Sequence, residues 1–185
     1  SYGRFLVVES PIMEPELAAK FPQIKTYLGQ GVDDPTATIR FDWTPHGFHA
    51  MILSAGETVY IDPHSQGNTS YYISYNKHDY KDFRTESFIK HPPVDDSNMA
   101  KQIESLVANN PVSVVGQQLR TYRLAVAATG EYTQFHGGTV SGAMAEVVTA
   151  INRVTGIYER DMAVRLVLIG NNDSIIYTNA STDPY

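Results

Sequence analysis

The 185-residue chain is 42% apolar and 18% charged, which is typical of a folded globular protein with one ordinary domain or two small ones. Its net charge of -6 is spread without runs of like charge, which excludes a basic nucleic-acid-binding surface and a polybasic membrane-binding stripe. The chain has no cysteine, so disulfides, thiolate zinc sites and a cysteine nucleophile are excluded within it. It shows no signal peptide and no apolar run long enough to span a bilayer.

Residues 1–90 have the pattern of short β-strands joined by turns. Apolar and polar residues alternate in Thr36–Trp43, and Pro45-His46-Gly47 is typical of a hairpin turn. Pro15 fits the first turn of a short helix over Glu14–Phe21, because its missing N–H costs little there. The pattern predicts a meander of about five strands with this helix beside it. The β-type runs are Arg4–Glu9, Ile24–Leu28, Thr36–Trp43, Phe48–Ser54, Thr58–Asp62 and Tyr71–Tyr75.

Residues 91–118 are predicted to be a connector. They begin with His91-Pro92-Pro93-Val94-Asp95-Asp96, which is polar, stiff and unsuited to regular structure. Asp96 or Ser97 then precedes an apolar stripe at helical spacing, so we expect a short helix that ends near Ala108.

Residues 119–185 change to a longer period. Apolar residues recur at spacings of three and four between Thr139 and about Arg160, which predicts one long helix capped by Thr139 or Ser141. A strand, a long helix and a strand in succession favour parallel pairing of the two strands. The sequence therefore predicts an α+β fold, with a small strand-rich domain followed by a β-α-β-β unit. The strands expected in this unit are Thr121–Ala128, Ala163–Ile169 and Ser174–Thr178.

Two sets of short sequence blocks point to a family. The N-terminal set is Val7–Met13, Tyr27–Gly31 and Asp34–Phe41. The C-terminal set is Arg120–Thr139, Asn152–Val154, Tyr158–Asp161, Leu166–Ile169 and Asn171–Asp173. The first set resembles the propeptide, and the second the opening of the catalytic domain, of reprolysin-like bacterial metalloproteases in the metzincin clan. The resemblance implies a propeptide domain over residues 1–90 and an incomplete, N-terminal part of a metzincin catalytic domain over residues 119–185.

The resemblance further implies the precursor of a secreted, extracellular zinc-dependent metalloendopeptidase, whose propeptide provides latency and assists folding. The zinc site of this family is a His-Glu-x-x-His-x-x-Gly-x-x-His segment, in which the histidines bind the metal and the glutamate activates a bound water. No His-Glu pair occurs in this chain. We therefore expect a fragment that stops before the zinc site, binds no zinc and is inactive alone, although the full-length enzyme uses zinc. No catalytic or metal-binding residue is assigned within it.

The expected partners also follow from the resemblance. The full-length enzyme would bind extended protein or peptide substrates, and the propeptide would contact the catalytic domain within the chain. An incomplete catalytic sheet would expose apolar surface along helix 140–157 or the edge of strand 174–178, which predicts self-association of the fragment. The alternative from another functional class is a non-catalytic extracellular binding or adhesin module that folds alone and binds without metal.

Three connector residues are candidates for capping the zinc ion of the precursor. In some relatives a propeptide side chain ligates that zinc, and without cysteine this role would fall to His91, Asp95 or Asp96, or to a residue upstream of Ser1. The alternative is a solvated linker in which Asp96 caps a helix. Arg120 is the candidate site of maturation cleavage, and the alternative for it is an ordinary basic residue at a strand edge.

The other polar residues that attract notice favour structural roles. His46 and His49 flank a turn, where surface residues are more common than metal ligands, and no carboxylate partner is apparent for them. His136 precedes two glycines and is interpreted as orienting the loop that enters the long helix. Asn171-Asn172-Asp173 lacks the spacing of a calcium loop and is predicted to be a turn.

Overall fold

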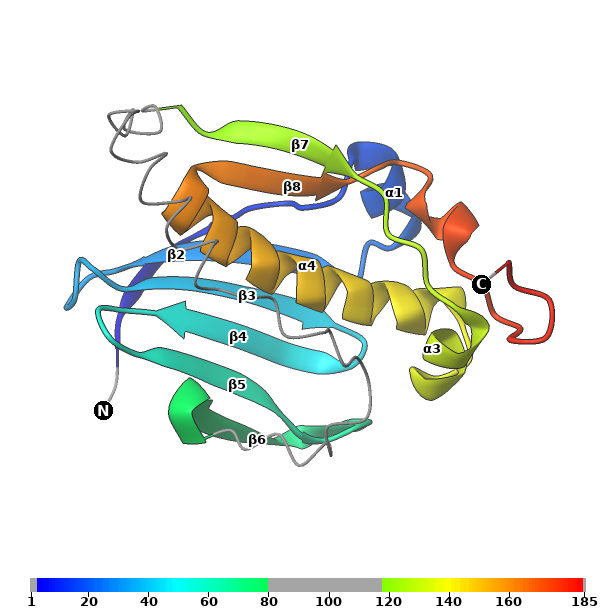
Figure 1. Ribbon diagram of the computed structural model, residues 1–185. Coiled ribbons are helices and arrows are strands. Elements are labelled where there is room, and N and C mark those ends of the chain that lie inside the picture. Colours follow the sequence, from blue (N-terminus) through cyan, green and yellow to red (C-terminus); the bar gives the residue numbers. More distant parts are fainter. Residues whose placement is uncertain (1–2, 80–117, 185) are drawn as a thin grey trace, which may run out of the picture.

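The N-terminal part of the chain forms one antiparallel sheet. The computed structural model describes residues 3–79 and 118–184, and six strands in the first of these ranges pair in chain order, each with the next (Figure 1). This confirms the predicted meander and adds one strand to it. The elements are β1 (Phe5–Glu9), α1 (Pro15–Lys20), β2 (Lys25–Gly31), β3 (Thr38–Thr44), β4 (Gly47–Leu53), β5 (Thr58–Ser65), β6 (Asn68–Asn76) and the 3-10 helix η1 (Lys77–Asp79).

The β3–β4 hairpin sets the orientation of several polar side chains. Its turn closes at Gly47, whose φ of 116° favours glycine. The register pairs Arg40 with Met51 and Asp42 with His49. Because side chains alternate along a strand, these four residues lie on one face of the sheet.

The C-terminal part is built around one long helix. Its elements are β7 (Arg120–Leu124), α3 (Gly130–Phe135), α4 (Val140–Met162), β8 (Val164–Leu168) and the 3-10 helix η2 (Asn172–Ile175). Thr139 caps α4 as predicted, since its Oγ1 accepts a hydrogen bond from the Gly142 N–H at 3.0 Å. Ala163, in the left-handed conformation at φ 52°, ends the helix. β7 and β8 pair in parallel, which confirms the expected strand–helix–strand unit.

The third strand predicted at Ser174–Thr178 is wrong. The chain forms η2 there and then makes a single bridge between Ala128 and Ile176. The Asn172 side chain explains the difference, because its Oδ1 accepts from the Val126 N–H at 2.8 Å and its Nδ2 donates to the Val126 carbonyl at 3.0 Å. These bonds occupy backbone groups that a ladder would use, so β7 also stops short of its expected end.

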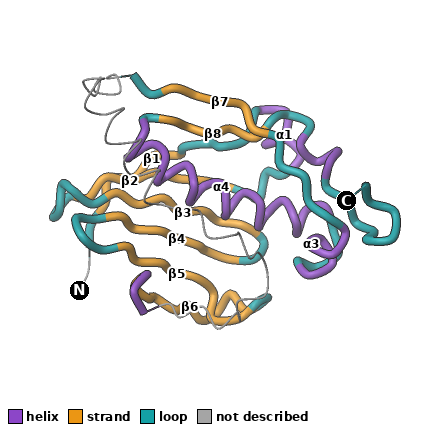
Figure 2. Tube along the Cα trace, viewed as in Figure 1, coloured by secondary structure: helices purple, strands orange, loops and turns teal. Residues whose placement is uncertain are grey.

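The helix α4 lies between the six-stranded sheet and the β7–β8 pair (Figures 1 and 2). The core joins both parts of the chain: Ile12 and Leu17, both fully buried, belong to the same apolar cluster as Met144, Val148 and Leu168. The segment around Ile12 leaves β1 and runs beside β8. The described residues on the two sides of the predicted connector therefore share one hydrophobic core.

Candidate functional site: the polar interface between the sheet and the long helix

The helix α4 presents small and polar side chains to the six-stranded sheet. Thr149, Asn152 and Gly156 recur at helical spacing and are buried. Gly156 allows the closest approach, because a Cβ at this position would lie 3.0 Å from Met51 Cε and 3.2 Å from Arg40 Cγ. This face of α4 is therefore shaped to pack directly on β3 and β4.

Replacing Gly156 with leucine should drive side-chain atoms into Met51 and Arg40, and lower the free energy of unfolding by about 1–3 kcal/mol. Ala150→Leu is the matched control, because Ala150 is exposed on the same helix. Urea unfolding of both variants measures the effect. Equal destabilisation by the two substitutions would contradict the close packing at Gly156.

Arg40 of β3 is the buried cation of this interface, at 2% exposure. Its Nη2 donates to Glu159 Oε2 at 2.6 Å, and its Nη1 donates to Asn152 Oδ1 at 3.1 Å. Burial lowers the pKa of the Arg40 guanidinium, while the hydrogen bond and the charge of Glu159 oppose that change. Glu159 also accepts a hydrogen bond from Arg165 of β8. The Arg40 charge thus joins β3 to α4 and, through Glu159, to β8.

Asp42 of the same strand is the buried anion, at 1% exposure. Thr149 Oγ1 donates to its Oδ1 at 2.8 Å, and His49 Nδ1 lies 3.0 Å from the same oxygen. Asn152 connects the two charges, because its Nδ2 donates to Asp42 Oδ2 at 3.4 Å while its Oδ1 accepts from Arg40. The prediction that His49 is a surface-turn residue is wrong. It lies within β4 and is buried, because the hairpin register turns it toward α4.

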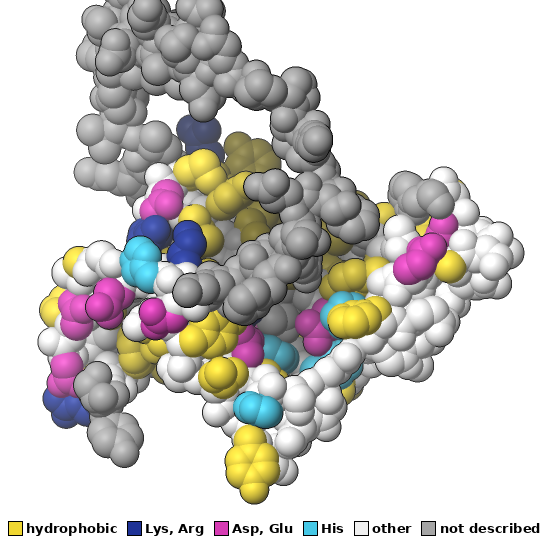
Figure 3. Space-filling model, turned by 60° about the horizontal axis from the view of Figure 1, so that its bottom comes forward, with side chains coloured by type: hydrophobic (Ala, Val, Ile, Leu, Met, Phe, Trp, Pro, Cys, Tyr) yellow, Lys and Arg dark blue, Asp and Glu magenta, His cyan; other side chains and the backbone are white. Residues whose placement is uncertain are grey.

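A second group of ionisable side chains lies at one end of this interface. His46 Nδ1 is 2.5 Å from Glu146 Oε1, and His136 Nδ1 is 4.0 Å from the same oxygen. The two imidazole rings lie 6.5 Å apart, centre to centre, and line a cavity of about 300 Å³. On the face drawn in Figure 3, histidine side chains gather beside acidic ones. Glu146 of α4 is thus the carboxylate partner of His46 that was not apparent from the sequence.

His136 should make the stability of the protein depend on pH. Burial lowers its pKa from the ordinary value of 6.5, Glu146 opposes this, and the charge of His46 adds to it. The unfolded chain therefore takes up a proton before the folded one does, so stability from neutral His136 falls as the pH drops from about 6.5 through the lowered pKa. The difference in unfolding free energy between wild type and His136→Asn should shrink between pH 7.5 and pH 5. Urea unfolding at both pH values measures it, and a constant difference would contradict the burial effect.

The residues predicted to cap zinc, His91, Asp95 and Asp96, lie outside the described residues, as does the predicted helix of the connector. Arg120, the candidate cleavage site, is the first residue of β7, and its N–H donates to the Ala163 carbonyl at 2.8 Å. Within residues 3–79 and 118–184, no group of three or more histidine, aspartate and glutamate side chains is arranged to hold a metal ion. The described residues therefore do not fit a zinc site, and no catalytic step is assigned to them.

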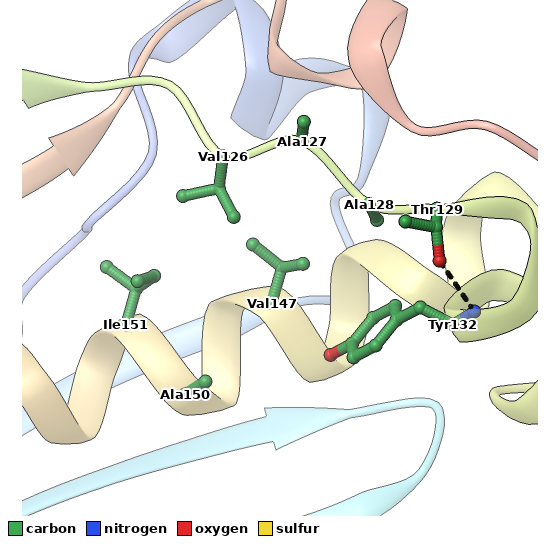
Figure 4. Close-up of a pocket in the computed structure, with 8 residues that line it drawn as sticks. All are labelled: Val126, Ala127, Ala128, Thr129, Tyr132, Val147, Ala150 and Ile151. Atoms are coloured by element: carbon green, nitrogen blue, oxygen red, sulfur yellow. Dashed lines mark hydrogen bonds between the residues drawn. The ribbon is translucent and has the colours of Figure 1, made fainter. Parts of the chain in front are cut away.

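An apolar groove runs along another side of α4. Val126, Val147 and Ile151 point toward one another across it (Figure 4), and its volume is about 290 Å³. At one end Thr129 Oγ1 caps α3 by accepting from the Tyr132 N–H at 3.3 Å. The groove lies on the helix where the sequence predicts exposed apolar surface. Self-association through this surface stays a prediction.

Part of the chain matches a known peptidase family. A comparison with curated proteins gave no match. None of the helices in the described ranges is long and apolar enough to cross a membrane. Residues 118–185 match the model of the reprolysin-like metallo-peptidase family M12B, and this stretch contains β7, α3, α4 and β8. The C-terminal part of the chain is therefore related to the M12B metallopeptidases, which are in general zinc-dependent hydrolases.

Proposed function

We propose that the chain is part of the precursor of a secreted bacterial metalloendopeptidase that uses zinc. In this proposal residues 118–185 are the start of the catalytic domain, and residues 1–90 are its propeptide. The observation that carries the proposal is the reprolysin-like match over β7, α4 and β8. Secretion is proposed because reprolysin-like proteases are typically extracellular.

The interface described above supports a propeptide that assists folding and keeps the enzyme latent. Without the sheet, α4 would expose Thr149, Asn152 and Gly156, and Leu168 would lose its contact with Ile12. The sheet supplies partners for these groups as the C-terminal part folds. A catalytic domain that folds against this sheet depends on it until its own remaining elements are in place.

Zinc enters this proposal through residues outside the described ranges. The histidines of a His-Glu-x-x-His segment would hold the ion, and the zinc would activate a water molecule for attack on the peptide bond. The residues described here would contribute the strands and the helix that support such a segment.

Peptidase assays on the full-length protein test this function. We expect a His-Glu-x-x-His segment beyond Tyr185, hydrolysis of an unfolded protein substrate once the propeptide is displaced, loss of activity with a chelator and recovery with zinc. Glutamine in place of the glutamate of that segment should lower kcat while leaving the fold intact. Absence of the segment, or hydrolysis that ignores both the chelator and the glutamine, would contradict the proposal.

One observation favours the alternative of an extracellular binding module. The face of the sheet opposite α4 carries a row of aromatic rings, in which Tyr27 stacks on Phe41 at 4.7 Å and Phe48 packs on Phe41 and Trp43. Trp43 is 58% exposed there. Large exposed aromatic side chains are frequent at binding surfaces. Specific, metal-independent binding that Trp43→Ala abolishes, in a protein without a zinc segment, would favour this function over the peptidase.

A further inference from the structure

We propose that residues 3–79 stay bound to residues 118–184 after the chain between them has been cut, so that cleavage produces a non-covalent two-chain complex. The inference goes beyond the proposed function, because it assigns the N-terminal part a lasting place as a subunit. It rests on the contacts between the two parts and on no peptidase activity.

The first support is the shared apolar core. Ile12 and Leu17 are fully buried, and they cluster with Met144, Val148 and Leu168 from the other part of the chain. Separation would expose these side chains on both sides to water. Apolar area removed from water is the main source of affinity in a lasting interface.

The second support is an extended segment that adds to the edge of β8. Leu168 N–H donates to the Ile12 carbonyl at 2.7 Å, and Glu14 N–H donates to the Leu168 carbonyl at 2.9 Å. The Glu14 carboxylate then accepts from the Gly170 N–H at 2.7 Å and from Arg123 Nε at 2.5 Å. This is binding by strand addition, in which main-chain bonds give affinity and side chains fix the register.

The third support is the match of buried charges across the interface. Arg40 is bonded to Glu159 and Asn152, and Asp42 accepts from Thr149, so each charge of β3 has its partners on α4. Such pairs discriminate strongly between the correct docking and any other. The N-terminal sheet is therefore fitted to this one helix surface.

None of these contacts uses the connector, so a cut within it removes none of them. What a cut removes is the high effective concentration that a covalent link provides. A core, a strand addition and a charge network together form an interface that does not need this help.

The test uses the full chain with a site-specific protease sequence in place of residues 91–96. After complete cleavage, both fragments should co-elute in size-exclusion chromatography at the volume of the uncut chain, even when diluted to about 1 μM, and should separate in denaturant. Fragments that separate, or of which one precipitates, would overturn the proposal. A missing zinc segment or missing peptidase activity would overturn the proposed function and leave this result unaffected.

A second pair of variants shows whether the interface itself holds the fragments. Cleaved Gly156→Leu should lose most of its co-elution, because the added side chain separates α4 from β3 and β4. Cleaved Ala150→Leu, altered at an exposed position of the same helix, should co-elute like the parent. Circular dichroism of the uncut variants confirms that both are folded before cleavage. Equal retention of the two variants would overturn the role assigned to this helix face.

Discussion

Replacing Glu159 with alanine should lower the free energy of unfolding by about 3–5 kcal/mol. The substitution leaves the Arg40 guanidinium buried without its carboxylate, and Arg40 is 2% exposed. An unpaired buried charge costs far more than an exposed pair contributes. Chemical denaturation at neutral pH gives the value directly.

Two controls separate the buried charge from general loss of packing. The double variant Arg40→Met with Glu159→Met removes both charges and keeps apolar volume, so it should recover most of the stability lost in Glu159→Ala. Lys25→Gln removes a cation whose partner is Glu9 in an exposed pair, and it should change stability little. If Glu159→Ala behaves like Lys25→Gln, the buried network does not hold the helix on the sheet.

Replacing Ile12 with alanine should lower the free energy of unfolding by about 2–5 kcal/mol. Ile12 is fully buried between α1, α4 and β8, so its truncation leaves a cavity in the core that both parts of the chain share. The loss should appear in a single unfolding transition that reports on α4 as well as on the sheet.

Leu6→Ala is the matched control for Ile12→Ala, because Leu6 belongs to the same N-terminal segment and is 73% exposed. It should cost little stability. An Ile12→Ala variant that melts β1 and α1 while α4 and β8 keep their original stability would show that the core is not shared.

The local elements of this protein could be predicted from short patterns. Alternation in Thr36–Trp43 and the turn at Gly47 indicate the β3–β4 hairpin, and the apolar residues after Thr139 indicate α4 and its N-cap. These signals lie within one turn or one hairpin. Local sequence therefore determines these elements before tertiary contacts add to them.

The interface could not be predicted, because its partners lie far apart in the chain. Thr149, Asn152 and Gly156 lie on the side of α4 that a hydrophobic pattern assigns to solvent. Arg40 and Asp42 give β3 the polar half of an ordinary alternation, so their burial is invisible without α4. Pairs such as Asp42 with Thr149, 107 residues apart, leave no periodic signal in a single sequence.

The missing third strand has a similar cause. Ser174–Thr178 has the composition of a strand, but the Asn172 side chain bonds to both backbone groups of Val126 and turns the chain instead. A side chain that replaces a ladder partner 46 residues away cannot be recognised from local propensity.

Native-state hydrogen exchange of the described protein tests most directly whether the two parts form one cooperative structure. We expect the slowest amides of β3, β4, α4 and β8 to share one opening free energy, and Glu159→Ala to lower all of them by the same amount. The contradicting result is an α4–β8 unit that keeps its protection while the six-stranded sheet opens separately.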